Sequence, residues 1–129
     1  MARKLTDRVK FLGFQPNPSP LYAAADIAVH ASSSEALSNF LIEAQAHGLP
    51  AVAYAAQGVE ECFIPGQTGW SIKPNDRDAF RGALLRLMSQ TNAERALIST
   101  AARKYARETF EPDRQVAAYL DLFNRLSRK

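Results

Sequence analysis

The sequence predicts an α/β fold, a doubly wound parallel sheet of about four strands with helices on both of its faces. Short continuous apolar runs recur along the first half of the chain, as expected for strands that are buried on both faces. These runs are Val9–Leu12, Ile27–His30, Ala51–Tyr54 and Trp70–Ile72. Helix or loop signals lie between them, and from Asn75 onward apolar residues recur at three- and four-residue steps. Ligands of such sheets bind beyond the carboxyl ends of the strands.

The N-terminal part is predicted to begin with the strand Val9–Leu12, which Gly13 ends. Three prolines between positions 16 and 20 then keep the chain in a loop, because proline restricts its own φ and lacks an N–H group. The alanine-rich segment Leu21–Ala25 is predicted to form a short helical turn, and the strand Ile27–His30 follows it.

A short helix is predicted from about Asn39 to His47. Ser38 or Asn39 can cap it, because their side-chain oxygens accept from the free N–H groups of a first helical turn, and Gly48 can end it. Apolar residues fall on every side of this helix. That pattern is typical of a buried helix rather than one on the surface.

Two glutamates flank the start of this helix. Glu43 lies within the apolar helix, where a carboxylate is costly unless it is paired or hydrogen-bonded. It is therefore either a buried side chain that holds a neighbouring loop or a ligand-binding group that faces a cleft. Glu35 lies in the loop between the strand Ile27–His30 and the helix. The free N–H groups at the helix start suit a phosphate, although every capped helix offers them.

The rest of the chain is predicted to be mainly helical. A helical turn at Val59–Phe63 and a type II turn at Pro65–Gly66 precede the last strand. Three helices with apolar stripes then follow, one capped by Asp76, one that contains Ile98 and one that starts near Pro112. We expect these stripes to pack in the core.

Composition limits the class of protein. The 129 residues, 47% of them hydrophobic, suit a single domain, residues 1–129. The 16 basic and 13 acidic residues are spread along the chain, so the net charge of +3 marks no nucleic-acid-binding arm. Cys62 is the only cysteine, which excludes an internal disulfide and suits a reducing compartment. His30 and His47 have no carboxylate or cysteine at metal-ligand spacing, so no metal site is expected. No membrane-spanning run or signal peptide is found, so we expect a cytoplasmic protein.

The order of several residues resembles one known family. FLG occurs at Phe11–Gly13 and YAAADIAVHAS at Tyr22–Ser32. Glu35 is followed after seven residues by Glu43 in an EA dipeptide, and GLP ends the stretch at Pro50. In these residues the chain is similar to the C-terminal half of GT-B glycosyltransferases, the large retaining group called glycosyl transferases group 1. The resemblance implies a partial Rossmann-like sheet in an incomplete GT-B C-terminal domain that is truncated at its N-terminus.

The resemblance also implies a donor site. The donor would be a nucleotide-diphospho-sugar, with no further cofactor. Glu35 would be the catalytic residue facing the donor sugar, and Glu43 would bind the ribose hydroxyls. The other donor-binding residues would be Ser38, Asn39 and Phe40 at the sugar or diphosphate, and Gly13, Phe14 and Gln15 at the base. Transfer would be retaining, through an oxocarbenium-like transition state stabilised by the departing diphosphate and nearby dipoles.

The chain departs from the family pattern in two ways. Ala36 stands where many relatives have glycine after the first glutamate. The arginine and lysine that neutralise the diphosphate belong to a part of the family sequence that would precede this chain, as does the acceptor half. We therefore expect the isolated chain to be inactive and to need the missing N-terminal half or a second chain. Without the preceding strands, Val9–Leu12 is expected either to pair with Ile27–His30 or to leave a surface for a homodimer.

The resemblance leaves two functions open. The first is a role in polysaccharide or lipopolysaccharide synthesis, in which the acceptor is a glycan or a lipid-linked molecule and no nucleic acid takes part. Such a protein would work in the cytoplasm, with peripheral association at the inner face of the cytoplasmic membrane. The alternative is a non-catalytic nucleotide-binding or interaction module that keeps the fold.

Overall fold

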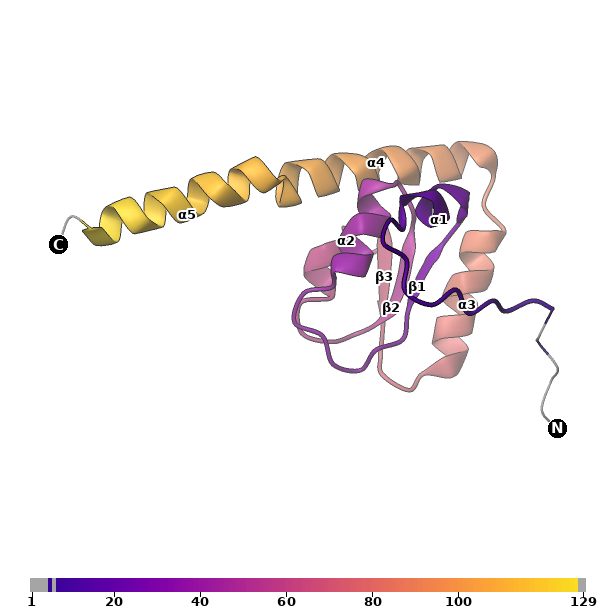
Figure 1. The fold of residues 1–129 in the computed structure, drawn as a ribbon. Coiled ribbons are helices and arrows are strands. Elements are labelled where there is room, and N and C mark those ends of the chain that lie inside the picture. Colours follow the sequence, from indigo (N-terminus) through magenta and orange to yellow (C-terminus); the bar gives the residue numbers. More distant parts are fainter. Residues whose placement is uncertain (1–4, 6, 128–129) are drawn as a thin grey trace.

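The computed structural model describes residue 5 and residues 7–127 (Figure 1). Three parallel strands form one sheet in the order β1-β2-β3, with Ala28 paired to Ala51 and Ala51 paired to Gly69. The strands are β1 (Ala28–His30), β2 (Ala51–Tyr54) and β3 (Gly69–Ile72). The helices are α1 (Ser19–Ala24), α2 (Asn39–Ala46), the 3-10 helix η1 (Glu60–Cys62), α3 (Arg77–Met88), α4 (Asn92–Phe110) and α5 (Pro112–Ser127).

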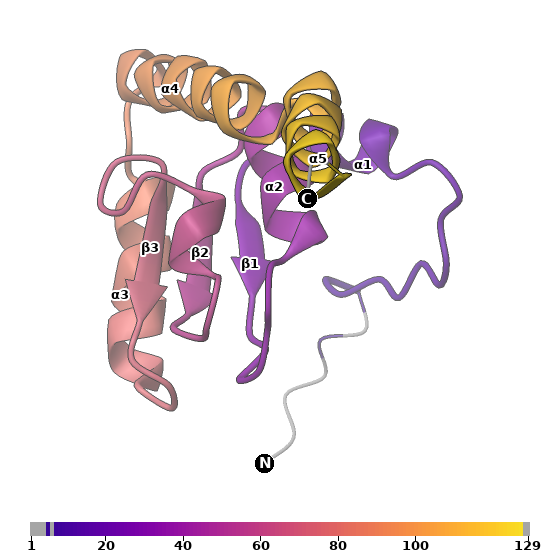
Figure 2. The ribbon, with the colours of Figure 1, turned by 90° about the vertical axis from the view of Figure 1, so that its left-hand side faces the viewer.

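Both faces of the sheet are covered, as predicted. Successive residues of a strand point to opposite faces, and β2 shows this directly. Ala51 and Ala53 belong to a core cluster with Leu41 of α2, whereas Val52 belongs to a second cluster with Leu87 of α3. Figure 2 shows α2 and α3 on opposite sides of the strands. The α/β class with a parallel sheet and helices on both faces is therefore confirmed.

The predicted strand Val9–Leu12 is wrong, so the described sheet has three strands rather than about four. This segment is exposed and has no strand conformation, and it does not pair with β1. A strand in water needs a neighbour that satisfies its N–H and C=O groups. Gly13, with φ of +65°, lies directly after the segment, and the proline-rich loop then leads to α1. Apolar character alone therefore did not suffice to form a strand here.

The prediction that α2 is buried all round is also wrong. Leu41, Ala44 and Gln45 are buried, but Phe40 and Glu43 are exposed. The covered sides of α2 face the sheet, η1 and α4. On the remaining side Tyr22 contacts Phe40 and Glu43, but both of these residues stay exposed. The apolar pattern of α2 therefore does not reflect burial on every side.

One helix cap and one turn form where the sequence predicts them. Ser38 is the N-cap of α2, since its Oγ accepts from the Leu41 N–H group. At the predicted type II turn, Gln67 N–H donates to Ile64 O over 3.1 Å, and Gly66 has φ of +74°. Glycine suits this third turn position because it adopts positive φ without strain.

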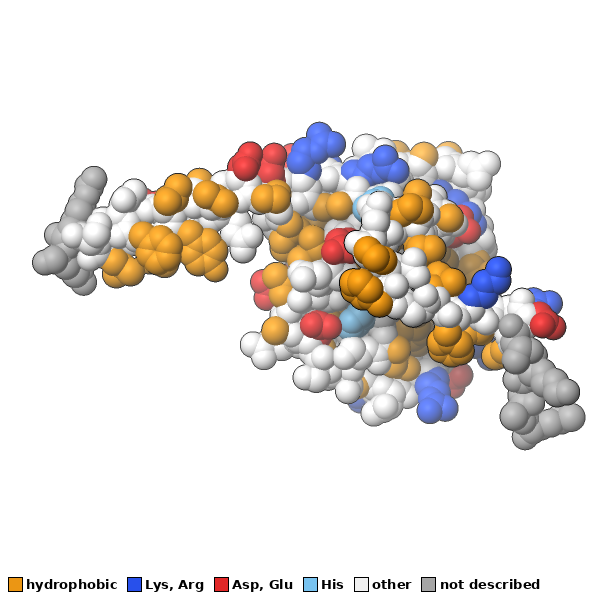
Figure 3. Space-filling view, viewed as in Figure 1, with side chains coloured by type: hydrophobic (Ala, Val, Ile, Leu, Met, Phe, Trp, Pro, Cys, Tyr) orange, Lys and Arg blue, Asp and Glu red, His pale blue; other side chains and the backbone are white. Residues whose placement is uncertain are grey.

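The C-terminal helices differ in their contacts. Helix α4 lies across the end of the sheet where the strands begin and contacts α2, and its Ala102 and Ala106 are buried (Figures 1 and 2). Helix α5 projects away from the rest of the structure and has no buried residue. Figure 3 shows apolar side chains gathered along it, and these include Val116, Tyr119 and Phe123. The expected core packing of the third stripe is therefore wrong for the described residues.

Within the described residues, no helix combines the length and apolar character that crossing a membrane would require.

Candidate functional site

Glu35 lies beyond the carboxyl end of β1 and contacts the last residue of that strand. The distance between Glu35 Oε2 and His30 Nε2 is 3.2 Å, and the side chains are 28% and 14% exposed. His30 Nδ1 is buried and has no hydrogen-bond partner among the described residues. The pair places a carboxylate and an imidazole at the end of the sheet where ligands of parallel sheets bind.

The loop that carries Glu35 is held by a close backbone contact. Gly58 has φ of +76°, and a Cβ atom at this position would overlap the carbonyl oxygen of Ala36. Within the loop, Ser32 Oγ donates to Ser34 O over 2.8 Å. The position of Glu35 therefore depends on a glycine that lies more than twenty residues later in the chain.

Glu43 lies on the exposed side of α2, where it accepts a hydrogen bond from Tyr22. The distance between Tyr22 Oη and Glu43 Oε2 is 2.9 Å. Tyr22 is 8% exposed, and burial, followed by the hydrogen bond and the negative charge of Glu43, raises the pKa of Tyr22 to about 12. Glu43 is thus neither buried nor unpaired, and its second oxygen, Oε1, has no hydrogen-bond partner within the described part of the chain.

Phe40 lies between the Glu35–His30 pair and the Tyr22–Glu43 pair. Its ring centroid is 6.0 Å from that of His30 and 6.0 Å from that of Tyr22. Tyr22 in turn stacks on His47 at 4.9 Å. Aromatic contacts therefore connect the Glu35–His30 pair to the Tyr22–Glu43 pair along one side of α2.

An apolar cleft adjoins this row of side chains. Its volume is about 500 Å³, which lies in the range of small-molecule sites. The residues that line it include Gly13, Phe14, Gln15, Tyr22, Val29 and Phe40. Phe14 is 90% exposed at its rim, and Gln15 Nε2 donates to Leu12 O over 2.7 Å. The structure thus brings the predicted base-binding segment next to Phe40.

The structure does not bring Asn39 into this cleft. Asn39 instead lines a separate cavity between the start of α2 and α5, with Arg114 and Gln115. The N–H groups of Asn39 and Phe40 belong to the first turn of α2, where a helix offers no internal acceptor. No group of three or more metal-ligating side chains occurs among the described residues.

Two residues of this arrangement were not predicted, His30 and Tyr22. A signal for His30 existed, because it ends a predicted strand on the same edge from which Glu35 follows. Tyr22 had no such signal, since its partner Glu43 lies 21 residues away in the chain.

The row of Glu35, His30, Phe40, Tyr22 and Glu43 combines two kinds of group. Its two carboxylates can accept hydrogen bonds from hydroxyl groups, and its aromatic faces can pack on a planar ring.

Known proteins similar to the chain are sugar transferases. A sequence model of the family described as "Glycosyl transferases group 1" matches residues 1–105. The lipopolysaccharide core biosynthesis glycosyltransferase LpsE of Rhizobium meliloti is 28% identical over 118 residues, which cover 92% of this chain and 34% of that protein. The D-inositol 3-phosphate glycosyltransferase of Salinispora tropica is 34% identical over 121 residues, which cover 92% of this chain and 25% of that protein. The chain thus spans about a quarter to a third of the length of these relatives.

Solved structures share the fold. HepE of Anabaena in complex with UDP has a TM-score of 0.80 and 30% identity, over 91% of this chain and 33% of that one. The complex of the same protein with UDP-glucose has a TM-score of 0.80 and 29% identity, with the same coverage. A glycosyltransferase from Rickettsia africae has a TM-score of 0.92 over 98% of this chain and 34% of that one, and at 23% identity it shows the fold alone.

Proposed function

The chain belongs to the glycosyl transferases group 1 family, and from this premise we propose that its cleft binds the donor of a retaining sugar transfer, a nucleotide-diphospho-sugar. Its fold is that of a GT-B C-terminal domain, of which the described residues form three parallel strands and their flanking helices. The observation that carries the proposal is the row of Glu35, His30, Phe40, Tyr22 and Glu43 beside the apolar cleft.

Glu43 is proposed to bind the ribose hydroxyls. Tyr22 already donates to Oε2 and so orients the carboxylate, while Oε1 remains available as an acceptor. A hydrogen bond from a hydroxyl to a carboxylate is charge-assisted and stronger than a neutral one. The cleft walls, which include Phe14 and Phe40, would pack against the base. Gly13 and Gln15 line the same cleft from the N-terminal segment.

Glu35 is proposed to face the donor sugar as the catalytic residue. Its contact with His30 holds the carboxylate at the end of β1, on the side where α2 begins. Ser38, Asn39 and Phe40 would offer the first turn of α2 to the sugar or diphosphate, because N–H groups there point away from the helix. The transition state would be oxocarbenium-like, with the departing diphosphate and these dipoles as stabilising charges. We propose no cofactor besides the donor.

The acceptor, the pathway and the location are also proposed. The relative LpsE is named for lipopolysaccharide core biosynthesis, so we propose this pathway, with a glycan or lipid-linked molecule as the acceptor. The free thiol of Cys62 is buried, which suits a reducing compartment such as the cytoplasm. Because the chain spans only part of its relatives, we expect acceptor-dependent transfer only when the rest of such an enzyme is supplied. A non-catalytic module would bind nucleotide and stay inactive even then.

Calorimetry with UDP and UDP-glucose tests the donor site. Glu43→Gln should raise the Kd of both ligands roughly ten- to a hundredfold, because the ribose is common to both and loses charge-assisted bonds. Glu35→Gln should weaken UDP-glucose more than UDP, because only UDP-glucose presents a sugar to this side chain.

Glu108→Gln is the matched control. It removes the same charge from the exposed surface of α4, away from the cleft, and should leave both affinities unchanged. If Glu43→Gln binds UDP as well as the unaltered chain while both are folded, then Glu43 has only the structural contact with Tyr22 and the proposed site is wrong.

A further inference from the structure

The proposed donor site carries two carboxylates, and neither pairs with a lysine or an arginine of the described chain. Glu35 lies 3.2 Å from Nε2 of His30, and Glu43 accepts a hydrogen bond from the hydroxyl group of Tyr22. The ion pairs that lysine and arginine side chains form among the described residues all have other acidic partners. The negative charges of Glu35 and Glu43 are therefore not offset by either kind of side chain.

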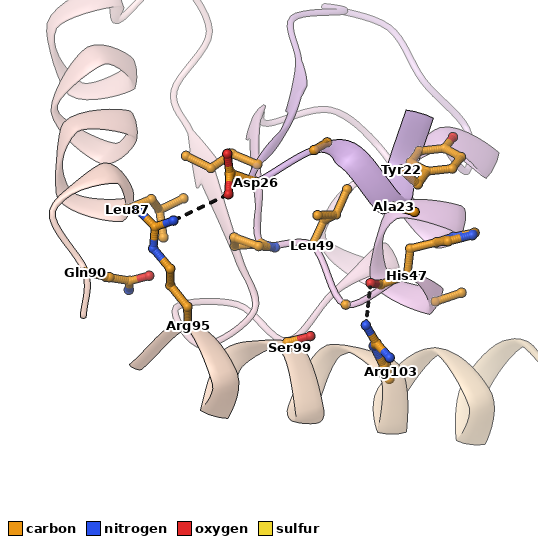
Figure 4. A pocket seen from close by; sticks show the side chains of 15 residues that line it. Tyr22, Ala23, Asp26, His47, Leu49, Leu87, Gln90, Arg95, Ser99 and Arg103 are labelled. Atoms are coloured by element: carbon orange, nitrogen blue, oxygen red, sulfur yellow. Dashed lines mark hydrogen bonds and ion pairs between the residues drawn. The ribbon is translucent and has the colours of Figure 1, made fainter. Parts of the chain in front are cut away.

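Two arginines of α4, Arg95 and Arg103, face the rest of the fold but are bonded to other groups (Figure 4). Arg103 Nη2 donates to His47 O over 3.2 Å, and Arg95 Nη1 contacts Asp26 Oδ1 at 3.4 Å. His47 follows Glu43 by one helical turn, and yet Arg103 bonds to the backbone of His47 and not to the Glu43 carboxylate. These two arginines thus do not pair with the carboxylates of the donor site.

The surroundings of Glu35 carry further negative charge. Burial is the main cause that raises the pKa of the Cys62 thiol, and the negative charges of Glu35 and Glu61 raise it further. The two carboxylates are thus close enough to act on the same buried thiol. In Figure 3 acidic and histidine side chains lie over α2 and the loop before it, whereas the Lys and Arg side chains of this view lie outside that area. The apolar cleft beside it has no charged residue in its lining.

The proposed arrangement of the donor puts its diphosphate at the start of α2 and its sugar beside Glu35. The N–H groups of a helix start stabilise negative charge, but this effect falls off beyond the first turn. Residues 38–40 supply these groups here. The diphosphate charge can therefore be offset by the helix, whereas the sugar meets a carboxylate.

Glu35 can bind a sugar hydroxyl but not a sugar carboxylate. Its Oε2 lies at His30, and its Oε1 has no hydrogen-bond partner in the described part of the chain. An ionised carboxylate only accepts hydrogen bonds, so it bonds to a hydroxyl group and repels a second carboxylate. The Glu35 side chain is 28% exposed, and partly buried charges are screened less than exposed ones. A negative group on the sugar therefore weakens binding at this position.

We propose that the donor sugar carries no negative charge, so that the site selects a neutral hexose over a uronic acid. This inference rests on the proposed function, because it takes Glu35 to face the sugar. It adds the chemical class of the transferred sugar, and it assigns the exclusion of sugar acids to the charge of Glu35.

Calorimetry with UDP-glucose and UDP-glucuronic acid tests the inference at about pH 8, where imidazoles are ordinarily neutral. The two donors differ only at the exocyclic carbon of the sugar, which is a hydroxymethyl group in one and a carboxylate in the other. UDP-glucuronic acid should have a Kd about tenfold higher, because like charges a few ångströms apart repel. UDP-xylose, which lacks this carbon, should bind more tightly than UDP-glucuronic acid, since it loses the contacts of the group without adding a charge.

Glu35→Gln should change the two affinities in opposite directions. It removes the charge and keeps the shape, so UDP-glucuronic acid should bind about fivefold more tightly while UDP-glucose binds more weakly. A merely structural role of Glu35 would weaken both donors. Glu108→Gln removes the same charge from α4 and should change the ratio of the two Kd values less than about twofold.

Salt provides a test that needs no variant. In the unaltered chain the ratio of the two Kd values should fall as the ionic strength rises, because salt screens the repulsion. The inference is wrong if UDP-glucuronic acid binds as tightly as UDP-glucose, or if Glu35→Gln weakens both. UDP binding that depends on Glu43, without a preference between the two sugars, would overturn this inference and leave the proposed function standing. Absence of UDP binding would overturn both.

Discussion

At the scale of single residues, Gly58 connects the stability of the protein to the position of Glu35. A side chain at Gly58 would need φ of +76° and would overlap the Ala36 carbonyl oxygen, which is backbone and cannot rotate away. Gly58→Ala should therefore lower the free energy of unfolding by at least about 2 kcal/mol, as measured by urea denaturation.

Gly82→Ala is the comparison for this prediction. Gly82 lies inside α3, and nothing lies within 4 Å of the place where its Cβ would be. Alanine has the higher helix propensity, so this change should raise the free energy of unfolding by about 0.5 to 1 kcal/mol. Equal effects of the two substitutions would show that the contact between Gly58 and Ala36 does not affect the free energy of unfolding.

Tyr22 should make stability depend on alkaline pH. Its pKa is raised from 10.0 to about 12 in the folded protein. Between these values the phenol is deprotonated in the unfolded chain but not in the folded one, so rising pH favours unfolding. The contribution of Tyr22 to the free energy of unfolding is therefore fully present below pH 10 and disappears as the pH approaches 12.

Comparison with Tyr22→Phe isolates this effect. The unaltered chain should be more stable than Tyr22→Phe by about 1 kcal/mol at neutral pH, where its hydrogen bond to Glu43 is intact. Urea denaturation should show this difference shrinking above pH 10. Tyr105, whose pKa is also raised by burial, is present in both proteins and does not affect the difference. A difference that stays constant with pH would contradict the assignment to the Tyr22 hydroxyl.

At the scale of elements, α5 contributes little to the stability of the rest. None of its described residues is buried, and apolar burial is the main stabilising term in folding. A chain that ends after Glu111 should keep its free energy of unfolding within about 1 kcal/mol of the full chain. Thermal or urea unfolding followed by circular dichroism measures this.

Truncation within α4 gives the contrast. A chain that ends after Thr100 loses Ala102 and Ala106, which are buried, and the Tyr105 hydrogen bond to Glu61 O. This chain should unfold at a much lower urea concentration or fail to fold. Should removal of α5 destabilise the protein as strongly as this second truncation, α5 must pack against the rest of the protein in solution.

At the scale of the whole molecule, the free edge of β1 should promote self-association. Among the residues that the structure describes, only one edge of β1 pairs with a strand, and an unpaired edge is a template for another chain. Val29 is 45% exposed there, and Phe14, which lines the same cleft, is 90% exposed. We expect the apparent mass in light scattering to rise from monomer to dimer as the concentration increases.

Substitutions can locate the contact. Val29→Lys should shift the dimer to higher concentrations, because a lysine on an edge strand opposes pairing. Leu97→Lys places the same charge on α4, at a side chain that is 73% exposed, and should have little effect. A strictly monomeric protein at every concentration would rule out the homodimer, and equal effects of the two lysines would rule out the β1 edge as its site.

The sequence by itself determined most of the elements, because their signals are local. The Ser38 cap, the type II turn at Gly66 and the apolar runs of β1, β2 and β3 depend on neighbouring residues, which the sequence displays directly. The spacing of Glu35 and Glu43, together with the EA dipeptide and GLP that follow, likewise indicated the family, which the match over residues 1–105 confirmed.

Only the tertiary structure decided which surfaces are covered and which side chains meet. Val9–Leu12 has strand character but no neighbouring strand, and α2 has apolar residues all round but neighbours on only some sides. The bond between Tyr22 and Glu43 joins residues 21 positions apart, and the contact of Arg95 with Asp26 joins residues 69 positions apart. The physical reason is that burial and pairing depend on distances between segments, which local periodicity does not contain.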